Sequence, residues 1–248
     1  MTHNESPTVV LVHGAFADGS SWSGVIERLA ARGVRAVAVA NPLRGIAADS
    51  SYVASVLAQT PGPIILVGHS YGGAIISNAA TDAPNVVGLV FVAAFAPDEG
   101  ETLGAVSAES KDSVLNSALV PRTYPTADGG TATEFFIDPA KAREAFASDV
   151  SEEQALVIGA VQRPVAELGF SDPNGPPAWK TLPSWAVVAT GDKAAGTDVV
   201  RSMAERAGAK ITEVEGSHVI MVSRPDVVTD VILEAVAAVG SPVGAAGD

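Results

Sequence analysis

A five-residue motif, Gly-His-Ser-Tyr-Gly at residues 68–72, is the feature that most constrains how this chain can fold. The apolar run 63–67 precedes it, and the helix-compatible stretch 73–80 follows it. A serine between two glycines at a strand-to-helix junction is typical of a nucleophile elbow, in which a sharp turn lifts the hydroxyl above a sheet. Side chains at positions 68 and 72 would collide with the neighbouring strand and helix. Ser70 is therefore the candidate nucleophile.

The rest of the chain alternates apolar strands with helices. We expect helices at residues 22–32, 48–59, 72–82, 198–207 and 225–239, and strands at residues 8–12, 35–40, 64–67, 86–94, 185–190 and 210–214. Continuous apolar strands that alternate with helices indicate a parallel sheet covered on both faces.

The alternation stops between residues 97 and 183, where prolines and glycines are frequent and no buried strand is evident. Short helices are plausible there near 139–146 and 152–161. The pattern predicts one α/β domain over residues 1–248, with a mainly helical cap inserted at about 97–183. The small-residue tail 240–248 is expected to be flexible.

Composition argues against several classes of function. The net charge of −13 disfavours nucleic acids and anionic membranes as partners. The absence of cysteine removes disulfides and thiolate catalysis, and the histidines and acids are not spaced as metal ligands, so we expect no metal and no cofactor. With no signal peptide visible at the N-terminus and no apolar run long enough to span a bilayer, a cytoplasmic monomer or homodimer is the expectation.

A serine hydroxyl needs a base to take its proton, and histidine is the usual one. Of the four histidines, His3 lies in a polar tail, His13 ends the first strand, and His69 adjoins the serine with its side chain expected to point away from the hydroxyl. His218 follows the last predicted strand, at the sheet edge where ligands of parallel sheets bind. His218 is therefore the candidate base, although a helix-capping role is the alternative.

The base needs a carboxylate to orient it. Asp192 follows strand 185–190 directly, which places it at the same sheet edge and gives the chain order serine, acid, histidine. Asp98, after strand 86–94, and Asp198, farther along the same loop as Asp192, are its rivals. An ordinary turn aspartate is the other interpretation of Asp192.

Two backbone N–H groups are candidates for an oxyanion hole. The Tyr71 N–H follows the nucleophile, and the Ala15 N–H lies in the loop after the first strand. Two such donors stabilise a tetrahedral oxyanion, and the loss of one donor reduces the stabilisation of the transition state by roughly 3 kcal/mol. We expect Gly14, Phe16 and Val219, which flank these groups, to contact substrate.

Four segments together resemble a known family. They are residues 10–16 (VLVHGAF), 68–73 (GHSYGG), 94–99 (AFAPDE) and 215–218 (EGSH). They are similar to the small cofactor-free α/β-hydrolases, in the esterase branch related to plant methylesterases and hydroxynitrile lyases. The resemblance spans about residues 8–239. It implies an α/β-hydrolase sheet that begins near the family's third strand, with a cap between the sixth and seventh strands.

The resemblance also refines the chemistry. In that branch the acid precedes the histidine by 26 to 28 residues, as Asp192 does, whereas Asp98 belongs to a Pro-Asp pair at the start of the cap. The lyases carry a lysine after the histidine and a threonine in the first oxyanion loop, where this chain has Val219 and Gly14. We therefore expect a serine hydrolase of small to medium apolar carboxylic esters. The alternatives are a cofactor-free C–C or lactone hydrolase, a haloperoxidase-like perhydrolase, and a non-catalytic small-molecule receptor.

Overall fold

A parallel sheet of six strands forms the centre of the structure, a computed structural model that describes residues 6–240. Its strand order is β2-β1-β3-β4-β8-β9. All six strands lie where the sequence predicts them, which confirms the expected parallel sheet. Their bounds are β1 (Thr8–Val12), β2 (Ala36–Val39), β3 (Ile64–His69), β4 (Val86–Val92), β8 (Ser184–Ala189) and β9 (Lys210–Val214).

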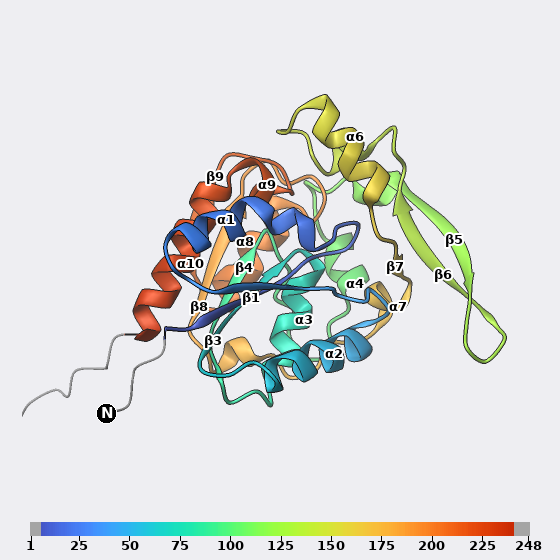
Figure 1. The fold of residues 1–248 in the computed structure, drawn as a ribbon. Helices are drawn as coiled ribbons and strands as arrows, with labels where there is room; N and C mark the ends of the chain where they lie inside the picture. The colour runs from blue at the N-terminus through green and yellow to red at the C-terminus, as the bar shows by residue number, and fades with distance from the viewer. Residues whose placement is uncertain (1–5, 241–248) are drawn as a thin grey trace, which may run out of the picture.

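Helices cover both faces of this sheet (Figure 1). Along β1, Val9 and Leu11 face one core cluster while Val10 and Val12 face the other, because successive side chains of a strand point to opposite faces. The first cluster includes side chains of α1 (Ser23–Ala31), α9 (Ile220–Ser223) and α10 (Pro225–Gly240). The second includes side chains of α2 (Ile46–Ala58), α3 (Tyr71–Ala79) and α8 (Thr197–Arg206).

The position of β3 matters most for function. β3 pairs with β1 on one side and with β4 on the other, so Leu66 lies opposite both Val10 and Leu89. The turn that follows β3 therefore opens at the middle of the sheet's carboxyl edge. Loops from the neighbouring strands reach the same place, as expected for ligand sites of parallel sheets.

The segment between β4 and β8 contains more than the expected helices. Helices α5 and α6 lie at their expected places, but a three-stranded antiparallel sheet, β5-β6-β7, was not predicted. The β5–β6 hairpin extends away from the main sheet, and α6 lies on the same side of the molecule (Figure 1). The elements are α4 (Leu103–Ala108), η2 (Leu115–Ala118), β5 (Leu119–Pro125), β6 (Thr131–Ile137), α5 (Ala142–Ala145), α6 (Glu152–Val161), β7 (Val165–Ala166), α7 (Leu168–Ser171) and η3 (Ala178–Lys180).

The hairpin escaped prediction because its side chains are mostly exposed or half-buried. It lacks the buried apolar run that marks a core strand. β5 also contains two prolines, which normally argue against a strand. They are tolerated because β5 is an edge strand that pairs with β6 alone in its sheet.

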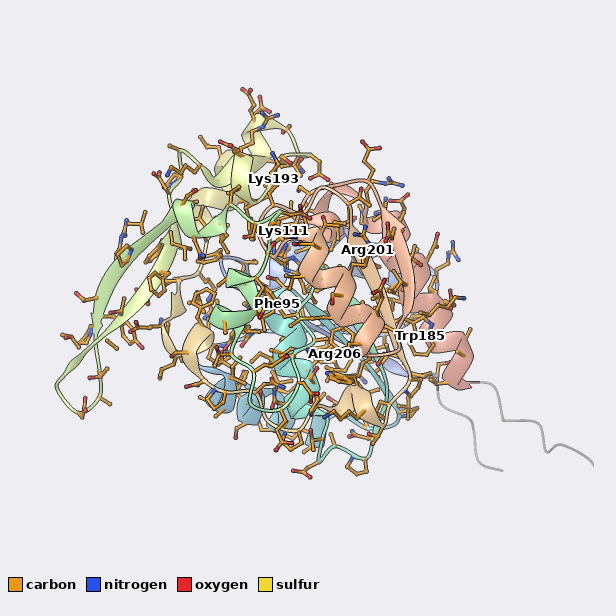
Figure 2. All side chains as sticks on the ribbon, turned by 180° about the vertical axis from the view of Figure 1, so that it is seen from behind. Phe95, Lys111, Trp185, Lys193, Arg201 and Arg206 are labelled. Atoms are coloured by element: carbon orange, nitrogen blue, oxygen red, sulfur yellow. The ribbon has the colours of Figure 1, made fainter. Side chains whose placement is uncertain are left out.

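Helix α8 connects the sheet to the start of this inserted segment. The Arg206 guanidinium donates to Glu101 at 2.6 Å and to the Ala96 carbonyl at 3.2 Å. Arg201 pairs with Glu213 of β9 at 2.6 Å. Both arginines lie on the side of the molecule that Figure 2 shows. Among the helices of residues 6–240, none combines the length and the apolar character that crossing a bilayer requires.

Candidate active site

Ser70 occupies the strained turn between β3 and α3. Its backbone has φ 53° and ψ −123°, a conformation that L-residues rarely adopt. The flanking glycines explain how the turn fits. A Cβ at Gly68 would lie 2.6 Å from the Gly72 carbonyl oxygen, and one at Gly72 would lie 2.5 Å from the Val12 carbonyl oxygen. The predicted collisions with strand and helix are confirmed, and the turn has the form of a nucleophile elbow.

His218 and Asp192 meet in the buried interior of the same sheet edge. The Nδ1–H of His218 donates to Asp192 Oδ2 at 2.8 Å, and each side chain is 1% exposed. The other carboxylate oxygen, Oδ1, accepts the N–H groups of Ala194 and Ala195 at 2.9 and 3.0 Å. These donors fix the carboxylate, which in turn fixes the imidazole with Nε2 available as a proton acceptor.

His69 contacts both the backbone and the ring of His218. Its Nε2–H donates to the His218 carbonyl at 3.0 Å, and the two rings lie 4.7 Å apart between centroids. Burial lowers the pKa of His69 well below its ordinary value, and the His218 imidazole lowers it further. His69 therefore stays neutral as a donor. The sequence placed it beside Ser70 but gave no sign of this role.

The inserted segment contacts His218 through Phe146 and the preceding residue, Ser217, through Asp149. The Phe146 ring packs 5.1 Å from the His218 ring. Asp149 accepts the backbone N–H of Ser217, the preceding residue, at 2.8 Å and also its hydroxyl. Neither residue was predicted, because both lie about 70 residues from His218 in a segment without a readable motif. A ring and a carboxylate near residue 146 carried no distinguishing signal.

The loop after β1 packs directly against Ser70, the candidate nucleophile. A Cβ at Gly14 would lie 2.7 Å from the Ser70 Cβ, so position 14 has no room for a side chain. Within residues 6–240, neither the Ala15 N–H nor the Tyr71 N–H donates a hydrogen bond to a protein group. Phe16, with φ 61°, donates its N–H to the Arg163 carbonyl at 3.1 Å, which ties this loop to the inserted segment.

Tyr71 has a second connection that the sequence did not reveal. Its hydroxyl donates to Asp49 Oδ2 at 2.7 Å, and Asp49 is fully buried. Burial raises the pKa of the Asp49 carboxyl, whereas the Arg44 backbone N–H and the Tyr71 hydroxyl oppose that rise. The pair anchors the first turn of α3 to the start of α2.

The rival acids are engaged elsewhere. Asp98 forms an ion pair with Lys180 at 2.5 Å, and this contact lowers the pKa of the Asp98 carboxyl. Asp198 accepts from the Ser110 hydroxyl and the Lys111 N–H. Among the described residues, no hydrogen bond joins either carboxylate to His218, whereas Asp192 has one.

An apolar cavity of about 330 Å³ adjoins the site. Two residues expected to contact substrate, Phe16 and Val219, line it together with Phe146. The remaining walls come from η1 (Gly19–Trp22) with its preceding loop, α6, and the α9 region. Within residues 6–240, no group of three or more histidine and acidic side chains is placed to hold a metal ion.

The sequence matches the Alpha/beta hydrolase family over residues 9–231. This chain belongs to that family. Carbendazim hydrolyzing esterase of Nocardioides sp. (strain SG-4G) is 34% identical to this family member over 134 residues, a match that covers 49% of this chain and 52% of the relative. The chain therefore spans about half the length of that curated relative.

Solved structures resemble this chain over nearly its whole length. Polyneuridine aldehyde esterase has a TM-score of 0.78 at 21% identity, covering 93% of this chain and 99% of that one. A pyrethroid hydrolase from Sphingobium faniae JZ-2 has a TM-score of 0.76 at 23% identity, covering 94% and 98%. At these identities the likeness concerns the fold. The family and fold that the sequence motifs implied are thus confirmed.

Proposed function

We propose that this hydrolase is a serine carboxylesterase whose nucleophile, base and acid are Ser70, His218 and Asp192. The Ala15 and Tyr71 N–H groups form the oxyanion hole. The observation that carries the proposal is the buried hydrogen bond from His218 Nδ1 to Asp192, at the sheet edge where Ser70 occupies its strained turn. A fixed tautomer with a free Nε2 is what a serine nucleophile requires of its base.

The reaction then proceeds in two balanced steps. His218 Nε2 takes the Ser70 proton while Oγ bonds to the ester carbonyl carbon. The carbon–oxygen bond to the alcohol breaks, and the imidazolium gives its proton to the departing oxygen. Water next loses a proton to His218 and attacks the acyl carbon. The acid leaves as the carbon–Oγ bond breaks, and the proton returns to Ser70.

The two unpaired N–H groups support the same assignment. The charge that develops on the carbonyl oxygen during both steps needs donors that are already in place. The Tyr71 N–H begins α3, where the orphan donors of a helix favour negative charge. The Ala15 N–H lies in the loop that packs against Ser70 at Gly14.

The substrate class follows from the site and from the relatives' names. The adjoining cavity is lined mainly by apolar side chains, which favours apolar acyl or alcohol groups. Relatives named as an esterase acting on carbendazim and as a pyrethroid hydrolase support carboxyl-derivative hydrolysis. Val219 stands where the lyases of the related branch have lysine, which disfavours cyanohydrin cleavage.

The test is pre-steady-state hydrolysis of p-nitrophenyl acetate. Wild-type protein should release a burst of p-nitrophenol followed by steady turnover, and Ser70→Ala should release neither above the buffer rate. Equal rates for the two proteins would contradict the proposal and favour a receptor. A burst without turnover of any carboxylic ester in a wider panel would favour C–C cleavage or perhydrolysis.

A further inference from the structure

The cavity between η1, α6 and α9 lies on the histidine side of the site. Phe146 packs against the His218 ring, and Val219 is the residue that follows His218. Phe16 contacts Phe146 edge-on at 6.2 Å between ring centroids and also lines the cavity. These three residues are 2% exposed each, whereas the α6 wall is open to solvent.

The chemistry of the first step determines which half of an ester faces this side. His218 Nε2 must reach the departing alcohol oxygen within hydrogen-bond distance to protonate it. The acyl carbon, in contrast, is bonded to Ser70 Oγ and its oxygen points to the N–H donors. A group attached to the alcohol oxygen therefore lies on the His218 side of the site, and the cavity lined by Phe146 and Val219 is the apolar space that adjoins His218.

We propose, on the basis of the esterase function above, that this cavity binds the alcohol portion of the substrate and selects for a large, apolar, non-anionic alcohol. Its volume of about 330 Å³ holds far more than a methyl group. The walls contributed by α6 are Val157, Ile158 and Val161. Val157 and Val161 are 54% and 53% exposed, and a bound alcohol would cover this apolar surface.

Acidic side chains that line the cavity account for the selection against anionic alcohols. Asp18 and Glu153 line it, and no lysine or arginine of the described part of the chain does. An alcohol that carries a carboxylate would meet like charge there without a cation to pair with. A neutral alcohol of the same length would not meet this repulsion, which salt would screen.

The size test compares esters that give the same acyl-enzyme. In wild type, kcat/KM for hexyl acetate should exceed that for methyl acetate by roughly tenfold or more. Val157→Trp should lower this hexyl-to-methyl ratio by a similar factor, because the indole fills the cavity. Leu156→Trp is the matched control, since Leu156 is 74% exposed on the same helix and does not line the cavity. The ratio of kcat/KM for methyl hexanoate to that for methyl acetate, which varies the acyl group, should stay the same in Val157→Trp.

Several outcomes would overturn the inference. If Val157→Trp changed the kcat/KM ratio of methyl hexanoate to methyl acetate but not that of hexyl acetate to methyl acetate, the cavity would bind the acyl group instead. A change in oligomeric state by light scattering, with both ratios unchanged, would make it an interface between copies of the chain. Val161→Trp repeats the experiment if Val157→Trp does not fold. Wild type that hydrolyses esters without an alcohol-size preference contradicts this inference alone, whereas no ester turnover contradicts the proposed function itself.

The charge test uses hexyl acetate and 6-acetoxyhexanoate at low salt. The kcat/KM for the anionic ester should be several-fold lower than that for hexyl acetate. Glu153→Lys should reduce this difference in kcat/KM between the two esters. Glu152→Lys is the matched control, because Glu152 occupies the same first turn of α6 but does not line the cavity. Equal narrowing by both variants would show a general field effect and contradict selection at the cavity mouth.

Discussion

Asp149 accepts two hydrogen bonds from Ser217, one from the backbone N–H and one from the hydroxyl. Ser217 is 3% exposed and directly precedes His218. A carboxylate of the inserted segment thus fixes the backbone that carries the proposed base. A hydrogen bond to a charged group contributes about 1.5–3 kcal/mol, which is enough to hold one loop position against alternatives.

We expect Asp149→Ala to lower kcat by roughly tenfold with a much smaller change in KM, because a loosened His218 affects the chemical steps more than ground-state binding. Asp149→Asn keeps one acceptor oxygen and should recover part of the loss. Ser148→Ala, at the exposed neighbouring position, is the control. Unchanged kcat in Asp149→Ala would show that the loop keeps its position without this carboxylate.

The identity of the acid is tested by two isosteric substitutions. Asp192→Asn should reduce kcat by roughly 10⁴-fold, because an amide cannot hold the imidazole in the required tautomer. Asp98→Asn removes the ion pair with Lys180, which is partly exposed, and should leave kcat within about twofold. Steady-state kinetics on one ester suffice. The reverse ranking would transfer the acid role to Asp98.

The buried His69 gives the stability of the protein a defined pH dependence. Its native pKa lies well below 6.5, while the unfolded chain takes up a proton near that value. The unfolded state therefore binds more protons as the pH falls below 6.5. The free energy of unfolding should decrease there by up to about 1.4 kcal/mol per pH unit for this group.

Urea denaturation at pH 7.5, 6.5 and 5.5 measures the effect. His69→Gln does not titrate, and its amide nitrogen can still donate to the His218 carbonyl, so its stability should fall less steeply. His13, whose pKa burial also lowers, contributes equally in both proteins and cancels from the comparison. Parallel pH profiles for wild type and His69→Gln would show that His69 titrates normally in the folded state.

The backbone N–H and the side-chain hydroxyl of Tyr71 have different expected roles, the first in catalysis and the second in stability. Tyr71→Phe keeps the proposed oxyanion donor but removes the hydroxyl that donates to buried Asp49. We expect a loss of about 1–3 kcal/mol in the free energy of unfolding, since a buried acceptor loses a partner. The kcat should stay within a few fold. A loss of kcat without a loss of stability would instead give the hydroxyl a direct part in the reaction.

The sequence predicted those parts of the site that follow strands of the main sheet. Ser70, Asp192 and His218 each come after a strand of the parallel sheet, so parallel topology alone brings them to one edge. Asp192 could be ranked above Asp98 because it directly follows its strand and because its spacing to His218 matches the family that the chain resembles, and the structure shows Asp192 against His218. The catalytic roles themselves await the substitutions above.

The remaining contacts could not be predicted for a physical reason. Phe146 contacts His218 and Asp149 contacts Ser217 from an inserted segment whose strands are mostly exposed or half-buried, so periodicity gives no register for this segment. Asp49 resembles an ordinary first-turn helix aspartate until Tyr71 is placed over it. Each contact joins elements distant in the chain, and such pairs leave no local pattern.

Helix α6 is suspended between two anchor points. Before the helix, Asp149 accepts a hydrogen bond from the N–H of Ser217, next to His218. After the helix, the Arg163 carbonyl accepts one from the N–H of Phe16. Within residues 6–240, the ten residues of α6 form no hydrogen bond to Ser70 or Asp192. We therefore expect mutations confined to residues 152–161 to change substrate choice with little effect on the chemical steps, so the proposed alcohol site makes this helix the natural target for combinatorial libraries.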